Sequence, residues 1–191
     1  MTMDFSRTAT AFALLAIAFT PLAACGEKAG ETATATAAVP SSATLGEALK
    51  DKEGLGKLEG VVKASGLETV LDGKGPYTVF APVDAALEAS GGTADLSDDA
   101  LRAQSIALIR AHTVPGALTR IDIGAAIDNA SGRTVEMRTM AGGLLKFTRD
   151  GQAIVVTAPD GATGSLIGAE SVVSNGVLQP VDGVLAKVPS G

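Results

Sequence analysis

The sequence predicts an α+β fold in which helices come first and an antiparallel sheet follows. From residue 44 to residue 131, apolar residues recur at helical spacing behind side chains that commonly cap helices. From residue 132 onwards the apolar pattern changes to period two, and turn signals separate the runs. With 191 residues, of which 46% are hydrophobic, the chain has the length of a single domain.

Residues 1–24 are predicted to be a signal peptide that does not belong to the fold. Arg7 supplies a positive charge, and the apolar run over 11–19 has signal-peptide length but is too short to span a bilayer. Leu-Ala-Ala-Cys follows and ends at Cys25, which is the only cysteine. This ending is similar to the bacterial lipoprotein signal, in which the cysteine receives a diacylglycerol. The alternative is an ordinary secretory peptide that is cut before Cys25 and leaves a free thiol.

Lipidation of Cys25 would place the protein in the bacterial cell envelope, bound to a membrane without a transmembrane helix. Each buried CH₂ of a lipid contributes about 0.8 kcal/mol, so that two or three acyl chains give a stable anchor. Gly26 follows the cysteine where an Asp would favour retention at the inner membrane, which points to the outer membrane. Without the lipid, the protein is expected to be periplasmic or secreted.

The segment 25–43 is predicted to be a flexible tether. It is rich in Ala, Thr and Ser, and too few large apolar residues are present to offset the entropy of ordering it. A loose coil of about 18 residues spans roughly 20–25 Å. The domain, predicted over 44–191, would therefore stand off the membrane.

The first predicted helices begin at Thr44, which has capping-box spacing to Glu47. The apolar residues of 55–62 recur every three or four positions and predict an amphipathic helix that ends at Gly66. Residues 67–71 add another helical turn before a turn-forming cluster.

A short buried strand is predicted next, over the β-forming residues Thr78, Val79 and Phe80. Pro82 cannot donate to a ladder, so the strand is expected to stop just before it. Asp84 is predicted to be the N-cap of the helix that follows.

A further helix is predicted from an N-cap at Ser97 to His112, which is the only histidine. Thr119 then starts a short helix with Ile123 and Ile127 buried. The remaining strands are predicted over 134–138, 144–148, 153–157, 167–173 and 177–188. Asp150-Gly151 is the strongest hairpin signal among them.

Three of these stretches resemble the motifs of fasciclin (FAS1) domains. Thr78-Val-Phe-Ala-Pro-Val-Asp84 is similar to the first box of the family, 175–185 to the second box, and 111–116 to the Tyr-His motif. The resemblance implies a β-wedge flanked by N-terminal and central helices, and a module of interaction or adhesion. The motif residues to which it assigns structural roles are Thr78, Phe80, Pro82, Asp84, His112, Pro115, Gly116, Asn175, Gly176 and Asp182.

The sequence departs from the family pattern at two positions. Ala111 stands where the family has the Tyr of the Tyr-His motif, so an adhesion role assigned to that Tyr does not carry over. Gln179 stands where the second box has His, and any titration of that His is missing here.

Few residues form a pattern that indicates catalysis. His112 would serve as a general base only beside a Ser or Thr and a carboxylate, and no G-x-S-x-G elbow is present. We favour a His112 ring that hydrogen-bonds the backbone and fixes the turn at Val114-Pro115. Asp84 and Asp182 would form an acid/base pair if they lay close together. The simpler interpretation is a helix cap for Asp84 and a turn at Asp182-Gly183.

Metal, nucleotide and nucleic-acid binding are weakly supported. A lone histidine makes no His-rich metal site, and the acidic group at 95–99 lacks the ligand spacing of a calcium loop. The glycines at 54–56 and 73–75 lack the strand-turn-helix context of phosphate-binding loops. A net charge of −6 and 3% aromatic residues argue against nucleic acid. No cofactor and no metal are expected.

The sequence therefore favours an envelope-anchored, non-catalytic interaction or adhesion module. Its expected partners are a membrane, through the lipid on Cys25, and a protein or cell-surface component. The alternative is a periplasmic small-ligand-binding protein, or an enzyme whose site has no motif.

Overall fold

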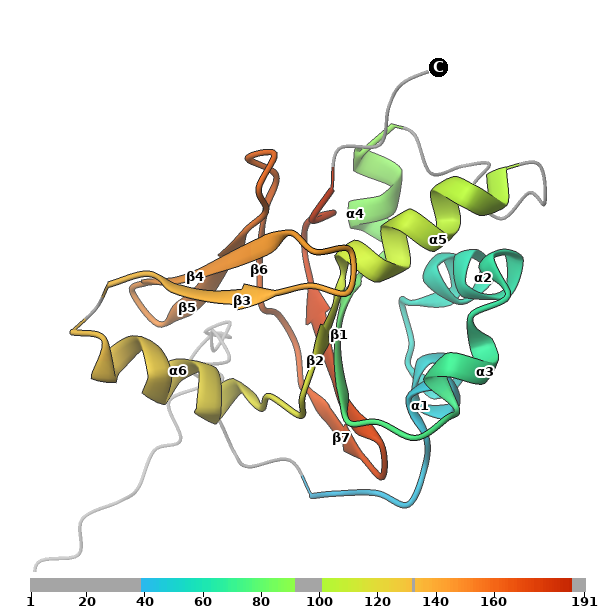
Figure 1. Cartoon of the computed structure of the whole chain (residues 1–191), viewed down its shortest axis with the longest axis horizontal. Coiled ribbons are helices and arrows are strands. Elements are labelled where there is room, and N and C mark those ends of the chain that lie inside the picture. The colour runs from blue at the N-terminus through green and yellow to red at the C-terminus, as the bar shows by residue number, and fades with distance from the viewer. Residues whose placement is uncertain (1–38, 92–100, 132, 187–191) are drawn as a thin grey trace, which may run out of the picture. The chain divides into compact units, whose positions relative to one another are not determined.

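The structure, a computed structural model, describes residues 39–91, 101–131 and 133–186, which lie in one compact unit of the chain. Helices and strands are arranged as Figure 1 shows. The helices are α1 (Leu45–Asp51), α2 (Gly56–Ser65), α3 (Glu68–Leu71), α4 (Asp84–Ala89), α5 (Arg102–Ala111) and α6 (Arg120–Asn129). The strands are β1 (Tyr77–Pro82), β2 (Thr113–Pro115), β3 (Val135–Arg138), β4 (Leu144–Asp150), β5 (Ala153–Thr157), β6 (Thr163–Ser165), β7 (Ser171–Val173) and β8 (Gly176–Val181). The predicted α+β class is confirmed.

The strands form two sheets. Sheet A has the order β2-β1-β8-β7, and sheet B has the order β3-β4-β5-β6. Neighbouring strands are antiparallel with one exception in the described chain, because β1 and β8 run parallel from the pair Tyr77–Gly176 to the pair Pro82–Val181. The prediction of purely antiparallel sheets is wrong at this pair. The period-two pattern that indicates strands carries no information on the direction of strands that lie about a hundred residues apart.

The two sheets are joined at both sides of sheet A. On one side, Leu166 forms a β-bridge with Val181, and Ile167 N–H donates to the carbonyl of Pro180 at 2.9 Å. On the other side, Met140 N–H donates to the carbonyl of Thr113 at 2.8 Å. These links make the wedge that the family resemblance implies.

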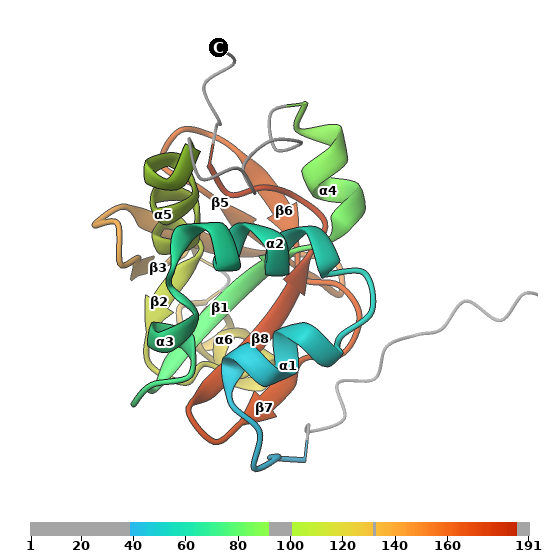
Figure 2. The same ribbon diagram turned by 90° about the vertical axis from the view of Figure 1, so that its right-hand side faces the viewer.

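Sheet A is covered on both faces. Figure 2 shows helices α1, α2 and α3 in front of β1 and β8, and Figure 1 shows these helices on one side of β1 and sheet B with α6 on the other. Along β1, Val79 and Ala81 pack in the core beneath the helices, while Phe80 packs in the core shared with sheet B. The rings of Phe80 and Phe147 lie 5.3 Å apart between the two sheets. Strands buried on both faces are expected to be nearly continuous apolar runs, as β1 is.

The starts of α1 and α6 and the end of α2 follow the prediction. Thr44 and Glu47 form a capping box at α1, and Thr119 and Asp122 form another at α6. Gly66 ends α2 with φ 72°, a left-handed conformation that favours glycine. The predicted short helix after Gly66 is confirmed as α3.

Six of the eight described strands were predicted, and β2 was not, because residues 113–115 were interpreted as a turn after a helix. The predicted strands 134–138, 144–148 and 153–157 correspond to β3, β4 and β5. The predictions 167–173 and 177–188 are too long, since β7 covers only Ser171–Val173 and β8 only Gly176–Val181. β6 was not predicted, because its sequence Thr-Gly-Ser has neither apolar alternation nor β-branched enrichment. The predicted cap Ser97 and the acidic group at 95–99 lie outside the described residues.

The last residues of the predicted tether contact the domain. Ser41 N–H donates to the carbonyl of Val172 at 2.9 Å, and Ser174 N–H donates to the carbonyl of Ala43 at 2.9 Å. Residues 41–43 thus lie along the outer edge of β7. The signal peptide and Cys25 lie outside the described residues.

Candidate functional site

The first and second boxes are neighbours at the centre of sheet A. The register of β1 and β8 places Thr78 opposite Val177, Phe80 opposite Gln179, and Pro82 opposite Val181. Pro82 is the last residue of β1, one position later than predicted. The position tolerates proline because β2 pairs only with Tyr77–Val79, so the missing N–H at Pro82 leaves no ladder bond unmade.

Asn175 joins three segments through one buried side chain that is 9% exposed. Its Oδ1 accepts from the backbone N–H of Leu45 at 2.8 Å, at the start of α1. Its Nδ2 donates to the carbonyls of Leu71 at 2.7 Å and Gly73 at 2.9 Å, at the end of α3. Asn175 therefore ties both helices to the turn before β8.

Gly176 is required for space. A Cβ at this position would lie 1.9 Å from the carbonyl oxygen of Tyr77 and 2.9 Å from a methyl carbon of Leu45. No other residue type allows β1 and β8 to approach so closely at their first pair.

Thr78 and Gly116 fix the chain between β2 and α6. The Thr78 hydroxyl donates to the carbonyl of Gly116 at 2.7 Å and accepts from the N–H of Leu118 at 2.8 Å. Gly116 has φ 107°, and its N–H donates to the carbonyl of Pro76 at 2.9 Å. Pro115 pairs with Tyr77 at the exposed end of β2.

His112 lies at the end of α5 and is 1% exposed. The backbone N–H of Leu185 donates to its Nε2 at 2.8 Å, so the ring proton is on Nδ1, which donates to the carbonyl of Leu108 at 2.8 Å. Burial lowers the pKa of His112 to about 4, although the Leu108 carbonyl and the charge of Asp160 act in the opposite direction. The ring bonds the backbone as predicted, but its partners are α5 and the C-terminal segment, not the Val114-Pro115 turn.

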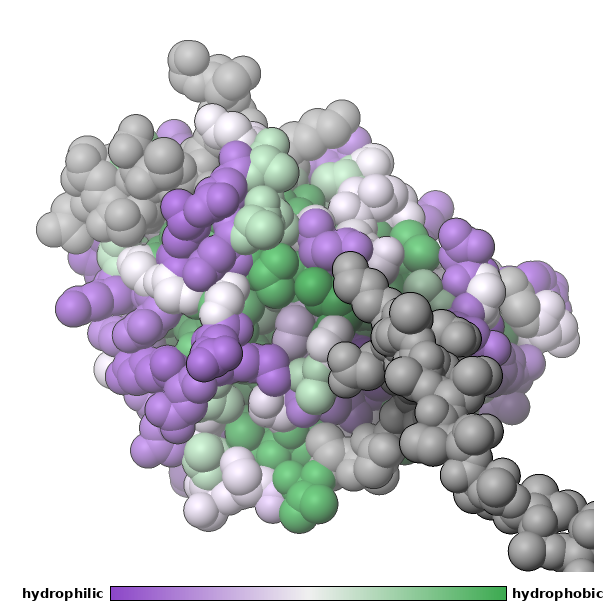
Figure 3. All heavy atoms as spheres, turned by 180° about the vertical axis from the view of Figure 1, so that it is seen from behind, coloured by the Kyte–Doolittle hydropathy of each residue, from purple (hydrophilic) through white to green (hydrophobic). Residues whose placement is uncertain are grey.

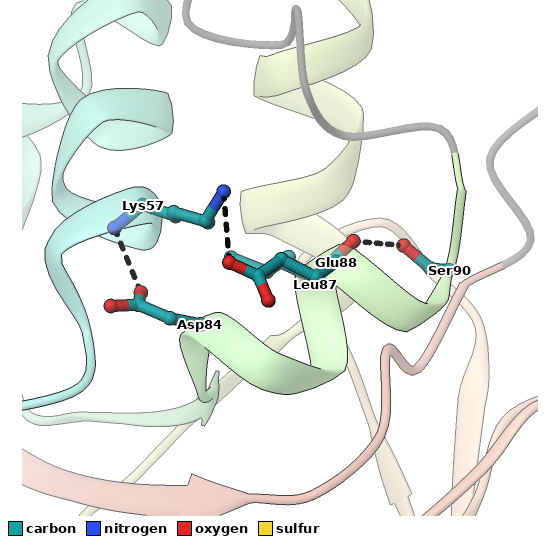
Figure 4. A network of polar contacts seen from close by, with 5 residues as sticks. All are labelled: Lys57, Asp84, Leu87, Glu88 and Ser90. Atoms are coloured by element: carbon teal, nitrogen blue, oxygen red, sulfur yellow. Dashed lines mark hydrogen bonds and ion pairs between the residues drawn. The ribbon is translucent and has the colours of Figure 1, made fainter.

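Asp84 does not cap its own helix, and that prediction is wrong. The N-cap of α4 is Val83, and Asp84 is the first residue of the helix. Its Oδ1 accepts instead from the backbone N–H of Lys57 at 2.8 Å, in the first turn of α2 (Figure 4). The start of α2 has no capping side chain of its own, because its N-cap is Leu55. Asp84 thus supplies a cap across the fold and links α4 to α2.

Asp182 is used elsewhere. Its N–H donates to the carbonyl of Ser165 at 3.1 Å, and its Oδ1 accepts from the N–H of Ser165. Both Asp84 and Asp182 follow the last pair of the parallel strands, yet each carboxylate has a separate backbone partner. The structure therefore gives each a structural role, as the simpler interpretation holds.

A buried polar network around Gln179 was not predicted. Gln179 is 0% exposed, and its Nε2 donates to a carboxylate oxygen of Glu170 and to the carbonyl of Leu118 at 3.2 Å. The same Glu170 oxygen accepts from the N–H of Arg120 at 2.7 Å, at the start of α6. Gln179 thus occupies the family's His position with a side chain that does not titrate.

Two cations hold the loop between β6 and β7 onto this network. The Arg120 guanidinium donates to the carbonyls of Ile167 at 3.0 Å and Gly168 at 2.8 Å, and Lys52 Nζ donates to that of Ala169 at 2.6 Å. Burial lowers the pKa of Lys52, and the nearby Arg120 charge adds to this effect. The sequence gives no signal for the network, since its members lie far apart in the chain and match no motif.

The arrangement of the motifs agrees with a match to a known protein family. The family model described as Fasciclin domain matches residues 53–187, which includes all three motifs. The chain belongs to the fasciclin domain family.

Two relatives illustrate the match. Protein sll1483 of Synechocystis sp. is 30% identical to this fasciclin domain protein over 152 residues, covering 78% of this chain and 76% of that protein. A solved structure of a FAS1 domain pair from the insect cell adhesion molecule fasciclin I superposes with a TM-score of 0.56 at 22% identity. The match covers 71% of this chain and 46% of that chain, so this chain spans about half of the insect domain pair. It shows the fold.

One face of the fasciclin domain carries many hydrophilic side chains (Figure 3). Seen from behind, hydrophilic residues cover much of the face and hydrophobic ones gather near its middle (Figure 3). Among the described residues, the exposed large hydrophobic side chains are Val39, Val70 and Ile121. One hollow of about 670 Å³ lies over the Asn175 turn and includes Thr44, Lys74 and Pro76 in its walls.

The described segments contain neither a cluster of metal ligands nor a helix that could span a membrane. Within 39–91, 101–131 and 133–186, no three His, Cys, Asp or Glu side chains are grouped so that they could hold a metal ion. In the same segments, no helix combines the length and the apolar character needed to cross a bilayer.

Proposed function

We propose that this protein is a non-catalytic fasciclin interaction module, anchored to the bacterial envelope through a lipid on Cys25. Membership of the fasciclin family supports the general role, because such domains are mainly interaction or adhesion modules that act outside the cytoplasm. The fold match to an insect cell adhesion molecule agrees with this role.

One observation carries the non-catalytic part of the proposal. The polar side chains of the motifs, which could in principle act in catalysis, are hydrogen-bonded to backbone groups of the same domain. This holds for Asn175, His112, Thr78, Asp84 and Asp182, each of which bonds a neighbouring segment. A catalytic acid, base or nucleophile must instead reach a substrate. In this fasciclin domain the motifs build the scaffold, and we place recognition on its outer surface.

The anchor is supported by the sequence around Cys25. The apolar run 11–19, the Leu-Ala-Ala-Cys ending and the single cysteine of the chain occur together. Residues 41–43 leave the domain along the outer edge of β7, which gives the tether a defined point of attachment.

Intact mass of the protein extracted from membranes tests the anchor. Wild type is expected to carry the mass of two or three acyl chains and to sediment with membranes. Cys25→Ser removes the thioether site and is expected to lose both properties, while Ser41→Ala, beyond the signal, keeps both. An unmodified wild-type chain in the soluble fraction would refute the anchor.

Adhesion is tested with cells. A strain that lacks the protein, a strain that expresses wild type and a strain that expresses Cys25→Ser are compared for attachment to cells and matrix. The wild-type strain is expected to bind best, and equal binding of all three strains contradicts the interaction role. A thermal-shift screen tests the alternative of a small ligand, because a ligand stabilises the folded state by RT ln(1 + [L]/Kd).

A further inference from the structure

The end of the described chain returns into the interior after β8. Val184 is 8% exposed and packs in the core beneath the helices, and Leu185 is 1% exposed and packs in the core shared with sheet B. The buried N–H of Leu185 has one acceptor, the Nε2 atom of His112, at 2.8 Å. A single imidazole nitrogen therefore holds the backbone of this segment at the point where it enters the core.

The His112 ring has little freedom to turn away. Its Nδ1 is engaged with the Leu108 carbonyl at 2.8 Å, one helical turn earlier in α5. Its own backbone carbonyl accepts from the N–H of Phe80 at 2.9 Å, which fixes the residue to β1. A second proton on the ring would have to sit on Nε2, where it would face the N–H of Leu185, and two donors cannot share a hydrogen bond.

We propose that His112 is a pH-sensitive latch, which holds residues 182–186 against the domain while the ring is neutral and releases them when Nε2 takes up a proton. The proton comes from solvent when the segment moves away, and water then bonds both the imidazolium and the freed Leu185 N–H. The hydrogen bonds between Asp182 and Ser165 open together with the segment, while the helices and the two sheets keep their own.

Charges around the ring set the range in which the latch opens. Asp160, in the turn after β5, is the charge that acts on the ring. The neighbouring elements also carry titratable groups: Arg102 and Arg110 on α5, Tyr77 on β1, Asp182 in the segment itself, and Lys57, Glu59 and Lys63 on α2, which packs against α5. Arg102 and Arg110 bond the carbonyls of Ser65 and Met140, and Asp182 bonds Ser165. Asp160 favours the protonated ring, but burial outweighs it and lowers the pKa to about 4. Release is therefore expected in acidic solution, at pH values below about 6.5, which is the pKa of a free imidazole.

Amide hydrogen exchange on the full chain tests the latch in the wild type itself. The Leu45 amide is a matched control, since its N–H also donates over 2.8 Å to a side chain, the non-titrating Oδ1 of Asn175. With His112 at a pKa of about 4 in the closed form and about 6.5 in the open form, opening at Leu185 rises about 20-fold between pH 7 and pH 5. After correction for intrinsic exchange, the Leu45 amide reports the opening of the fold away from the latch, and it is expected to stay more strongly protected than Leu185 at both pH values.

The same exchange measurement on the variant His112→Gln is the second part of the experiment. Gln does not titrate, so the protection of Leu185 is expected to be the same at both pH values, whatever its absolute level. Two results would overturn the latch. The first is equal protection of Leu185 at pH 7 and pH 5 in the wild type, and the second is equal protection of Leu185 and Leu45 at pH 5, which would mean that Leu185 opens only by global unfolding. Both results are measured on the wild-type protein, so the proposal can be refuted even if the His112→Gln variant does not fold.

Discussion

Replacing Asn175 by Ala is expected to loosen the attachment of α1 and α3 to sheet A. The substitution removes three hydrogen bonds: the one from Leu45 N–H at 2.8 Å, and those to the carbonyls of Leu71 at 2.7 Å and Gly73 at 2.9 Å. A typical intramolecular hydrogen bond contributes about 1 kcal/mol net, so the free energy of unfolding is expected to fall by about 3 kcal/mol. For a domain of this size, that loss lowers Tm by about 6–12 °C.

Urea denaturation followed by circular dichroism measures the effect, which should appear as a lower midpoint at an unchanged slope. Ser174→Ala is the matched control, because the Ser174 hydroxyl bonds the carbonyl of Ala43 in an exposed setting, where deletion costs about 0.5 kcal/mol or less. Asn175→Asp should be at least as destabilising as Ala at pH 7, since a carboxylate oxygen would face two carbonyls. A loss below 1 kcal/mol for Asn175→Ala, equal to that of the control, would refute the reasoning.

Three further outcomes are expected. Asp84→Ala should lower the free energy of unfolding by about 1 kcal/mol in the same urea titration, because it uncaps α2. Its control is Glu88→Gln, which breaks only the exposed ion pair with Lys57 at 3.2 Å and should lower the free energy of unfolding by less than about 0.5 kcal/mol. Gly176→Ala should cost more than about 3 kcal/mol or prevent folding, which soluble yield and circular dichroism report. Since the pKa of His112 is lower in the folded state (about 4) than in the unfolded chain (about 6.5), the unfolded state binds more protons below pH 6.5. Wild type should therefore lose about 2 kcal/mol between pH 8 and pH 5 that His112→Gln does not lose.

Local signals in the sequence predicted the helices well. The capping boxes at Thr44 and Thr119 and the glycine at 66 act within a few residues of their own helix, so the sequence contains all their partners. The cap of α2 could not be predicted in this way. Its carboxylate comes from Asp84, 27 positions after Lys57, and reaches the helix only because of the tertiary fold.

The motif residues were found through the family resemblance, and their contacts were not. Asn175 bonds a residue 130 positions away, and His112 bonds one 73 positions away. No spacing rule links such pairs in a single sequence. The buried network of Gln179 with Arg120 and Glu170 shows the same limit, because a lone Gln in an apolar strand gives no sign of its partners.

The parallel pairing of β1 with β8 has a consequence for the order in which the domain folds. β8 is the last strand of the described residues, and it lies between β1 and β7 in sheet A. Until residues 176–181 have been synthesised, β1 has only the three-residue strand β2 beside it, and β7 has no neighbour in the sheet. Contacts between distant segments form slowly, because the loop between them must close first. A nascent chain of this protein therefore stays without a complete sheet A until residues 176–181 have been synthesised, and truncation before β8 removes the centre of the sheet and not just an edge.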